Sequence, residues 1–212
     1  MGKHEFGYAR VERDFYPTPS WVVAALAEHV DLNGMIAWEC ACGDGRMASA
    51  LRLVGCAHVH CSDIVDRGNG QDEVLDFLSA QEPNLAHFDA AITNPPFGPL
   101  GTLAAAFIES GLRRIKRGAL LALLLPADFD SAKKRRPYFA DCPDFTAKIV
   151  LNEGIVWFRR NDGKREQPKE NHAWFVWERS PLRDRRPPIL RYAPVQGKPA
   201  VCGKMCRAIP GE

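Results

Sequence analysis

The chain lacks the long apolar stretches that would mark a membrane protein. Its longest apolar run, residues 119–125, is far shorter than the roughly 20 residues that a helix needs to cross a lipid bilayer. The first six residues, Met1–Phe6, have no apolar core, so a signal peptide is not expected. A length of 212 residues allows one well-buried domain and is short for two. We therefore expect a cytoplasmic protein that does not associate with membranes.

Paired cysteines are also missing. The seven cysteines are an odd number, and no two of them are spaced as Cys-x-x-Cys. Cys40 and Cys42 lie one residue apart, but no second pair of ligands is nearby, which argues against structural zinc. We expect reduced thiols and no bound metal.

Basic residues are scarce in the first half of the chain. Residues 1–110 contain 6 Lys and Arg against 15 Asp and Glu, a net charge of −9, whereas residues 111–212 contain 22 against 11, a net charge of +11. The basic residues of the second half fall into five clusters that are interleaved with aromatic residues: 113–117, 133–136, 159–160, 164–165 and 183–186. This pattern favours a polyanionic partner over a merely solvated surface.

Strand and helix patterns alternate along the chain. Short apolar runs predict strands at residues 35–38, 58–62, 88–93, 119–125, 147–151 and 174–177. Helical spacing of apolar residues is found at residues 21–30, 46–54, 72–79 and 103–117. Such alternation predicts an α/β fold with a doubly wound, mostly parallel sheet and helices on both of its faces.

One domain is expected over residues 1–180, followed by a Pro- and Arg-rich tail over residues 181–212. Within the domain, residues 128–145 and 158–171 are polar, basic and without apolar periodicity. Long loops of this kind are uncommon in compact domains unless they bind something. We interpret both as candidate substrate-recognition insertions.

The segment Asn94-Pro95-Pro96-Phe97 follows the strand predicted at residues 88–93. Its two prolines remove two backbone donors and fix two φ angles, which stiffens the loop. The Asn94 side-chain oxygen and the Pro95 carbonyl can accept hydrogen bonds from one amino group, and Phe97 can lie against the ring that carries it. Taken alone, the segment is more typical of a rigid turn.

Two glycines and an aspartate, all candidates for ligand binding, follow or end predicted strands. Gly43 and Gly45 follow the first strand, where the lack of a Cβ lets backbone approach a ligand. Asp63 ends the second strand, 18 residues after Gly45, near the spacing of about 20 at which an acid meets ribose hydroxyls. The loop lacks the full Gly-x-Gly-x-x-Gly pattern, so a nucleoside without a pyrophosphate is expected.

Taken in order, these motifs resemble the class I S-adenosylmethionine-dependent methyltransferases, and specifically the DNA adenine-N6 methyltransferases of small phage or bacterial type. Residues 16–19, Tyr-Pro-Thr-Pro, resemble the family's methionine-binding motif, placed first as in its gamma arrangement. Residues 39–45 resemble its first motif, Asp63 its ribose acid, Asp76-Phe77 its adenine-binding pair and residues 94–97 its catalytic loop. The resemblance covers about residues 15–130.

The resemblance implies a seven-stranded Rossmann-like sheet, S-adenosyl-L-methionine as cofactor and DNA as substrate. The residues that it implies for cofactor binding are Tyr16, Thr18, Pro19, Glu39, Ala41, Gly43, Gly45, Asp63, Ile64, Asp76 and Phe77. The catalytic loop would comprise Asn94, Pro95, Pro96 and Phe97, with the adenine flipped out of the duplex and stacked on Phe97. Candidate phosphate contacts are Lys133, Lys134, Arg135, Arg136, Arg159, Arg160, Lys164, Arg165 and Lys169.

Two alternatives stay open at this point. An amino methyltransferase that acts on RNA adenine or on protein glutamine would use a similar loop. A protein of another class, a catalytically inactive cofactor-binding module that binds nucleic acid, would keep the fold and the charge. We recognise no separate target-recognition domain, which leaves room for a partner subunit that supplies sequence specificity; the recognition sequence and the oligomeric state are not predicted.

Overall fold

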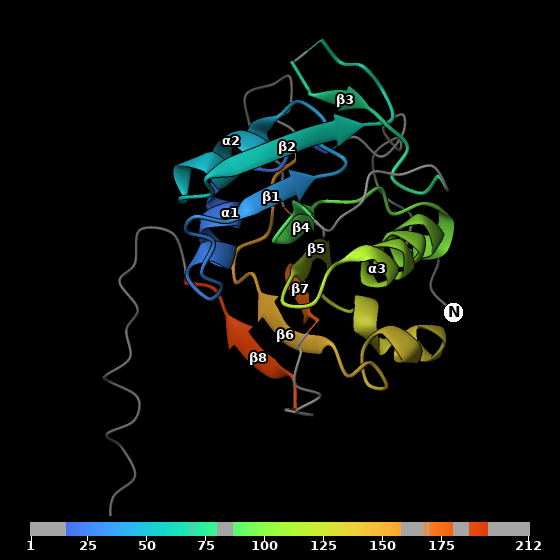
Figure 1. Ribbon diagram of the computed structural model, residues 1–212. Helices are drawn as coiled ribbons and strands as arrows, with labels where there is room; N and C mark the ends of the chain where they lie inside the picture. Colours follow the sequence, from blue (N-terminus) through green and yellow to red (C-terminus); the bar gives the residue numbers. More distant parts are fainter. Residues whose placement is uncertain are drawn as a thin grey trace, which may run out of the picture.

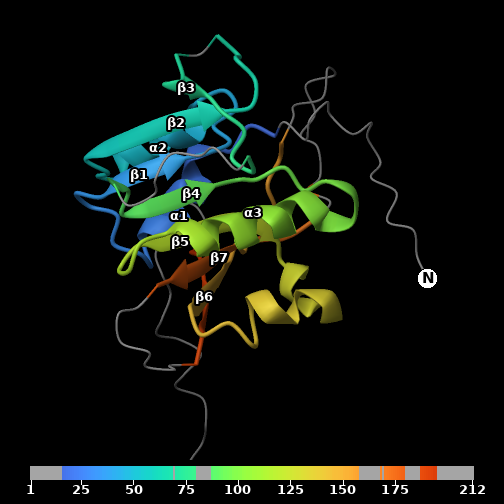
Figure 2. The same cartoon turned by 45° about the vertical axis from the view of Figure 1, so that its right-hand side comes forward.

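One eight-stranded sheet forms the centre of the molecule, with helices on both of its faces (Figures 1 and 2). The computed structural model describes residues 16–68, 70–79, 87–157, 168, 170–179 and 187–194. The strand order is β3-β2-β1-β4-β5-β7-β6-β8, so β3 and β8 form the two edges. In the described part of the chain, no helix is long and apolar enough to cross a lipid bilayer.

The strands are β1 (Ile36–Glu39), β2 (His58–Asp63), β3 (Glu73–Val74), β4 (Ala90–Thr93), β5 (Leu120–Pro126), β6 (Phe145–Val150), β7 (His172–Glu178) and β8 (Ile189–Tyr192). The α-helices are α1 (Ser20–Ala27), α2 (Arg46–Leu53) and α3 (Thr102–Arg114), and the short 3₁₀ helices are η3 (Pro99–Gly101), η4 (Phe129–Ser131) and η5 (Lys133–Tyr138). The first five strands of the order pair in parallel. Strand β7 is antiparallel to both of its neighbours, β5 and β6, and β8 is parallel to β6.

Strand β5 shows why a continuous apolar run becomes a strand here. Leu120, Ala122 and Leu124 pack into the core beneath α1 and α2, whereas Leu121 and Leu123 pack into the core beneath α3. Both faces of the sheet are therefore covered, and alternation between apolar and polar residues is not required. Figures 1 and 2 show α1 and α2 on one side of the sheet and α3 on the other.

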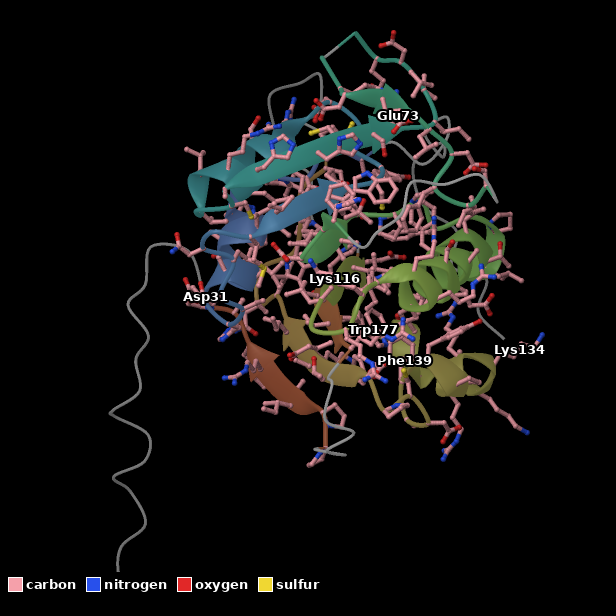
Figure 3. The ribbon with its side chains drawn as sticks, viewed as in Figure 1. Asp31, Glu73, Lys116, Lys134, Phe139 and Trp177 are labelled. Atoms are coloured by element: carbon pink, nitrogen blue, oxygen red, sulfur yellow. The ribbon has the colours of Figure 1, made fainter. Side chains whose placement is uncertain are left out.

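An aromatic cluster extends the α3-side core over β6 and β7. The rings of Phe139 and Trp177 lie side by side, with centroids 5.5 Å apart (Figure 3). The Trp177 indole Nε1 donates a hydrogen bond to the Tyr138 carbonyl at 2.7 Å. This cluster holds η5 against the sheet, so the segment predicted as a loop at residues 128–145 contains two short helices and a buried aromatic anchor.

Two sequence-based expectations about the elements are wrong. Residues 72–79 were expected to form a helix, but Glu73 and Val74 form the edge strand β3. Asp72 decides the outcome, because its backbone N–H and its carboxylate both bond the backbone of Cys61 in β2. The sheet also has eight strands rather than seven, since Ile189–Tyr192 pairs with β6 within the stretch expected as a tail.

We predict that Leu121→Ala lowers the free energy of unfolding by about 2 to 5 kcal/mol, because it leaves a cavity in a fully buried strand. Leu53→Ala is the matched control, since Leu53 is 83% exposed and its truncation should change stability by less than about 0.5 kcal/mol. Urea denaturation of both variants measures the difference. Equal losses in the two variants would contradict this view of the core.

Candidate active site

A cavity of about 860 Å³ opens at the carboxyl ends of β1, β2 and β4. Strand order reverses between β1 and β4, which is where doubly wound sheets bind ligands. Its volume lies within the range of roughly 300 to 1,000 Å³ found for small-molecule sites. The cavity is lined by residues of the three strand ends and the loops that follow them, together with the segment that precedes α1.

The loop after β1 turns sharply through two glycines. Gly43 has φ +55° and Gly45 has φ +77°, a backbone region that favours glycine. The N–H of Gly43 donates to the Asp63 carboxylate at 2.9 Å, and the N–H of Val65 donates to its other oxygen at 3.0 Å. Asp63 thus fixes the β1 loop against the end of β2, at the wall of the cavity.

Glu39, the last residue of β1, is buried and only partly satisfied. Its Oε1 accepts hydrogen bonds from the Thr93 hydroxyl and from the Ala41 N–H. Its Oε2 is buried and has no hydrogen-bond partner among the described residues. Burial raises the pKa of Glu39 from 4.5 to about 8, and the charge of Asp63 adds to the effect. Glu39 is among the residues that line the cavity, and a cation beside its carboxyl group would satisfy it.

Asn94 follows β4 directly, and its amide is held in one orientation. Its Nδ2 donates to the Tyr16 carbonyl at 3.3 Å and to the Thr18 hydroxyl at 3.2 Å. A carbonyl can only accept, so the amide nitrogen must face the segment before α1. The Asn94 Oδ1 is left buried without a hydrogen-bond partner among the described residues. Asn94 is among the residues that line the cavity, so the site holds a buried acceptor without a partner beside the space for a ligand.

Phe97 belongs to a chain of rings beside the cavity. Its ring stacks on His172 with centroids 6.3 Å apart, Trp157 meets His172 edge-on at 5.2 Å, and Tyr16 meets Trp157 at 5.5 Å. Burial lowers the pKa of His172 to about 4, so its ring is neutral at pH 7. The sequence analysis did not predict His172 as a site residue. A polar residue at the start of an apolar strand was the available signal. Its position beside Phe97 follows from the antiparallel pairing of β7 with β5, in which His172 lies opposite Pro126.

Phe77, another residue that lines the cavity, is fixed by its packing. Its ring stacks on Phe107 at 4.8 Å and meets Trp38 edge-on at 5.4 Å. The Arg114 guanidinium lies 4.3 Å from the centre of the Phe77 ring and donates to the Phe77 carbonyl at 2.7 Å. Arg114 therefore supports the site from within, although the sequence placed it in an exposed basic cluster.

The structure gathers most of the residues predicted for cofactor binding and catalysis around one cavity. Those that line it are Tyr16, Thr18, Glu39, Ala41, Gly43, Asp63, Ile64, Asp76, Phe77, Asn94 and Pro96. Four do not: Pro19 caps α1, Gly45 caps α2, Pro95 is buried, and Phe97 packs towards His172. Sequence reasoning did not anticipate the lining residues Met47, Arg67, Leu103 and Phe107.

The basic segment 133–136 divides into two kinds of residue. Arg135 donates to the carbonyls of Phe129 at 2.9 Å and Leu100 at 2.8 Å, and Arg136 pairs with Asp141 at 2.9 Å. Lys133 and Lys134 are exposed, and Lys134 lies at the outer edge of the molecule in Figure 3. The other candidate phosphate contacts lie outside the described residues: Arg159, Arg160, Lys164, Arg165 and Lys169.

Solved structures with a similar fold come from several bacteria and archaea. A protein from Listeria monocytogenes described as a class I S-adenosylmethionine-dependent methyltransferase has a TM-score of 0.64 and 18% identity, covering 92% of this chain and 70% of that one. A modification subunit described as part of a type I restriction enzyme from Vibrio vulnificus has a TM-score of 0.55 and 18% identity, covering 78% and 44%. A protein from Pyrococcus horikoshii described as an RNA methyltransferase has a TM-score of 0.57 and 15% identity, covering 82% and 92%.

No protein-family model and no curated protein sequence matches the chain. This chain spans less than half the length of the restriction subunit from Vibrio vulnificus. At identities of 18% or less, these likenesses establish the fold, which is that of the class I S-adenosylmethionine-dependent methyltransferases.

The pH dependence of stability tests the environment of Glu39. Because its pKa is raised from 4.5 to about 8, its protonated form stabilises the fold below pH 4.5, and this contribution is lost as the pH rises to about 8. His172 acts in the opposite direction: its pKa is lowered from 6.5 to about 4, so its contribution is present above pH 6.5 and lost as the pH falls to about 4. The window from pH 6.5 to 8 therefore isolates Glu39.

In that window we predict that the free energy of unfolding of the ligand-free protein falls by up to about 1.4 kcal/mol per pH unit. Glu39→Gln, which cannot ionise, should show a flat profile over the same range. Chemical denaturation at several pH values measures both slopes. Equal slopes in the wild type and the variant would show that another group is responsible.

Proposed function

We propose that this protein is an S-adenosyl-L-methionine-dependent methyltransferase that methylates the N6 amino group of adenine in DNA. The observation that carries the proposal is the buried Asn94 Oδ1, which has no hydrogen-bond partner among the described residues while the amide nitrogen is held on both sides. An acceptor oriented in this way, followed by a proline carbonyl and an aromatic ring, suits an exocyclic amino group on a flat base.

Residues that line the cavity suit both the methionine end and the nucleoside end of the proposed cofactor. The unpartnered Glu39 oxygen supplies negative charge for the ammonium group of the methionine end, next to Thr18. At the other end, Asp63 offers carboxylate oxygens to ribose hydroxyls, and Ile64 and Phe77 offer apolar surface to the adenine ring. When bound, S-adenosyl-L-methionine supplies a methyl group that is already activated by its sulfonium.

Asn94 and Pro95 provide the electrostatic part of catalysis in this proposal. The lone pair of the adenine N6 is delocalised into the ring, so the nitrogen is a poor nucleophile. Acceptors at Asn94 Oδ1 and the Pro95 carbonyl would favour the more tetrahedral nitrogen and the positive charge that develops on it. Alignment of nitrogen and methyl group then suffices, and the proton leaves to water afterwards, so no side-chain base is required.

A flipped base is needed because the amino group of a stacked adenine cannot reach a buried asparagine. The exposed Lys133 and Lys134 would hold phosphates in a salt-sensitive manner. The choice of DNA is supported by the family resemblance and by the likeness to modification subunits of type I restriction enzymes. We further propose that a partner subunit supplies sequence specificity.

Methylation assays with Asn94→Ala test the proposed role of the amide. The wild type, incubated with S-adenosyl-L-methionine and DNA, should produce N6-methyladenine, detected by mass spectrometry. The variant should lose at least on the order of 100- to 1,000-fold in rate, as expected for removal of one transition-state acceptor. Methyl groups found only in RNA or only on protein glutamine would overturn the proposed substrate, and no methylation of any of the three would favour an inactive binding module.

Proton release on cofactor binding tests the assignment of Glu39. A cation placed beside a carboxyl group whose pKa is about 8 lowers that pKa, so binding near pH 7 should release a proton. Calorimetric titration with S-adenosyl-L-methionine in two buffers of different ionisation enthalpy should give different heats for the wild type. Glu39→Gln should give equal heats and affinity lower by about ten-fold or more. Equal heats for the wild type would place the cation elsewhere.

A further inference from the structure

Leu100 is displayed to solvent in an unusual way. It is 93% exposed, the highest value among the large apolar side chains that the structure describes. Its φ of +54° is the only positive φ of a non-glycine residue in the described part of the chain. Leucine rarely adopts this backbone conformation, and residues held in it tend to lie at functional sites. An apolar side chain that is both strained and exposed calls for a binding partner.

The loop that carries Leu100 is held in place by Arg135. The Arg135 Nη2 donates to the Leu100 carbonyl at 2.8 Å, and its guanidinium lies 3.6 Å from the centre of the Phe129 ring. Gly101, with φ +74°, lets the arginine approach closely, since a Cβ there would lie 2.6 Å from Nη2 and 2.8 Å from Phe129. The Gly101 N–H closes the turn on the Gly98 carbonyl at 3.2 Å. The loop is therefore built to hold Leu100 outwards.

The position of this loop links it to the cavity. Gly98 and Pro99, directly before Leu100, line the cavity that Asn94 enters. The N–H of Leu103 donates to the Phe97 carbonyl at 3.2 Å, which ties the loop to the proposed catalytic segment. Leu100 thus directly follows two residues that line the cavity.

Exposed positive charge adjoins the arginine that holds Leu100. Lys133 and Lys134 directly precede Arg135 and are exposed. An exposed apolar side chain next to cavity-lining residues and linked through Arg135 to exposed lysines suits a nucleic acid, whose phosphates can pair with the lysines and whose stacked bases can contact the leucine. A purely apolar protein partner would leave the lysines without a role.

We propose that Leu100 is a wedge that enters the DNA base stack and fills the space left by the target adenine when it turns into the cavity. The inference rests on the proposed function and names the residue that would hold the duplex open. A base that leaves the stack exposes the faces of its neighbours, and an apolar side chain can cover them and oppose return of the base. No bond is made or broken in this step.

The test compares a paired target with one that is already unstacked. Methylation is measured on a duplex that the wild type methylates, and on the same duplex with an abasic site opposite the target adenine. Leu100→Ala should lower kcat/KM on the paired duplex by about ten-fold or more and on the abasic duplex by less than about two-fold, because an unpaired base is cheaper to flip. Leu53→Ala, the matched control at an 83% exposed leucine, should change neither.

A second variant separates the wedge from simple damage to the fold. Leu100→Gly should raise the melting temperature, because glycine accepts a positive φ without strain, and should still lose activity on the paired duplex. Equal losses on both duplexes, or no loss on either, would overturn the wedge while leaving the proposed function intact. A wild type that methylates no DNA would overturn the proposed function and the wedge together.

Discussion

The pair of hydrogen bonds donated by the Asn94 amide is the interaction on which the site depends. It joins the loop after β4 to Tyr16 and Thr18, which lie 78 and 76 residues earlier in the chain. The side-chain hydroxyl of Thr18 is used for this contact and not to cap α1, whose N-cap is Pro19. The two bonds place the proposed methionine-binding segment beside the proposed catalytic loop and leave Oδ1 without a partner among the described residues. Loss of either bond would free the amide to rotate.

Two buried polar atoms without partners among the described residues, Glu39 Oε2 and Asn94 Oδ1, give the cavity its chemical character. A buried polar group without a partner costs about 1 to 3 kcal/mol, so the ligand-free fold carries these groups at the expense of stability. The two differ in the ligand group that they suit: the Glu39 carboxyl, once ionised, would pair with a cation, whereas the neutral amide of Asn94 suits an uncharged amino group. One cavity that offers both fits a charged cofactor and a neutral base side by side.

Much of the fold could be predicted because apolar runs and helical spacing depend on local sequence, as for β5 and α3. The site could be predicted in outline because strand ends meet at one edge of a parallel sheet. The features that the sequence did not predict depend on contacts between residues far apart in the chain. Asp72 drew its neighbours into the edge strand β3. Arg114 and Arg135 read as surface charge in the sequence, but each lies against an aromatic ring and bonds a backbone carbonyl. The place of His172 depended on a strand register that no local pattern encodes.

In the proposed reaction, Asn94 Oδ1 accepts a hydrogen bond from the amino group of the target base. The most direct measurement is a double-mutant cycle on binding, with adenine or unsubstituted purine at the target position of an oligonucleotide and with wild type or Asn94→Ala as the protein. We expect that loss of the amino group weakens binding to the wild type by about ten-fold, as for one buried hydrogen bond, and leaves binding to Asn94→Ala unchanged. Equal weakening in the two proteins would contradict it.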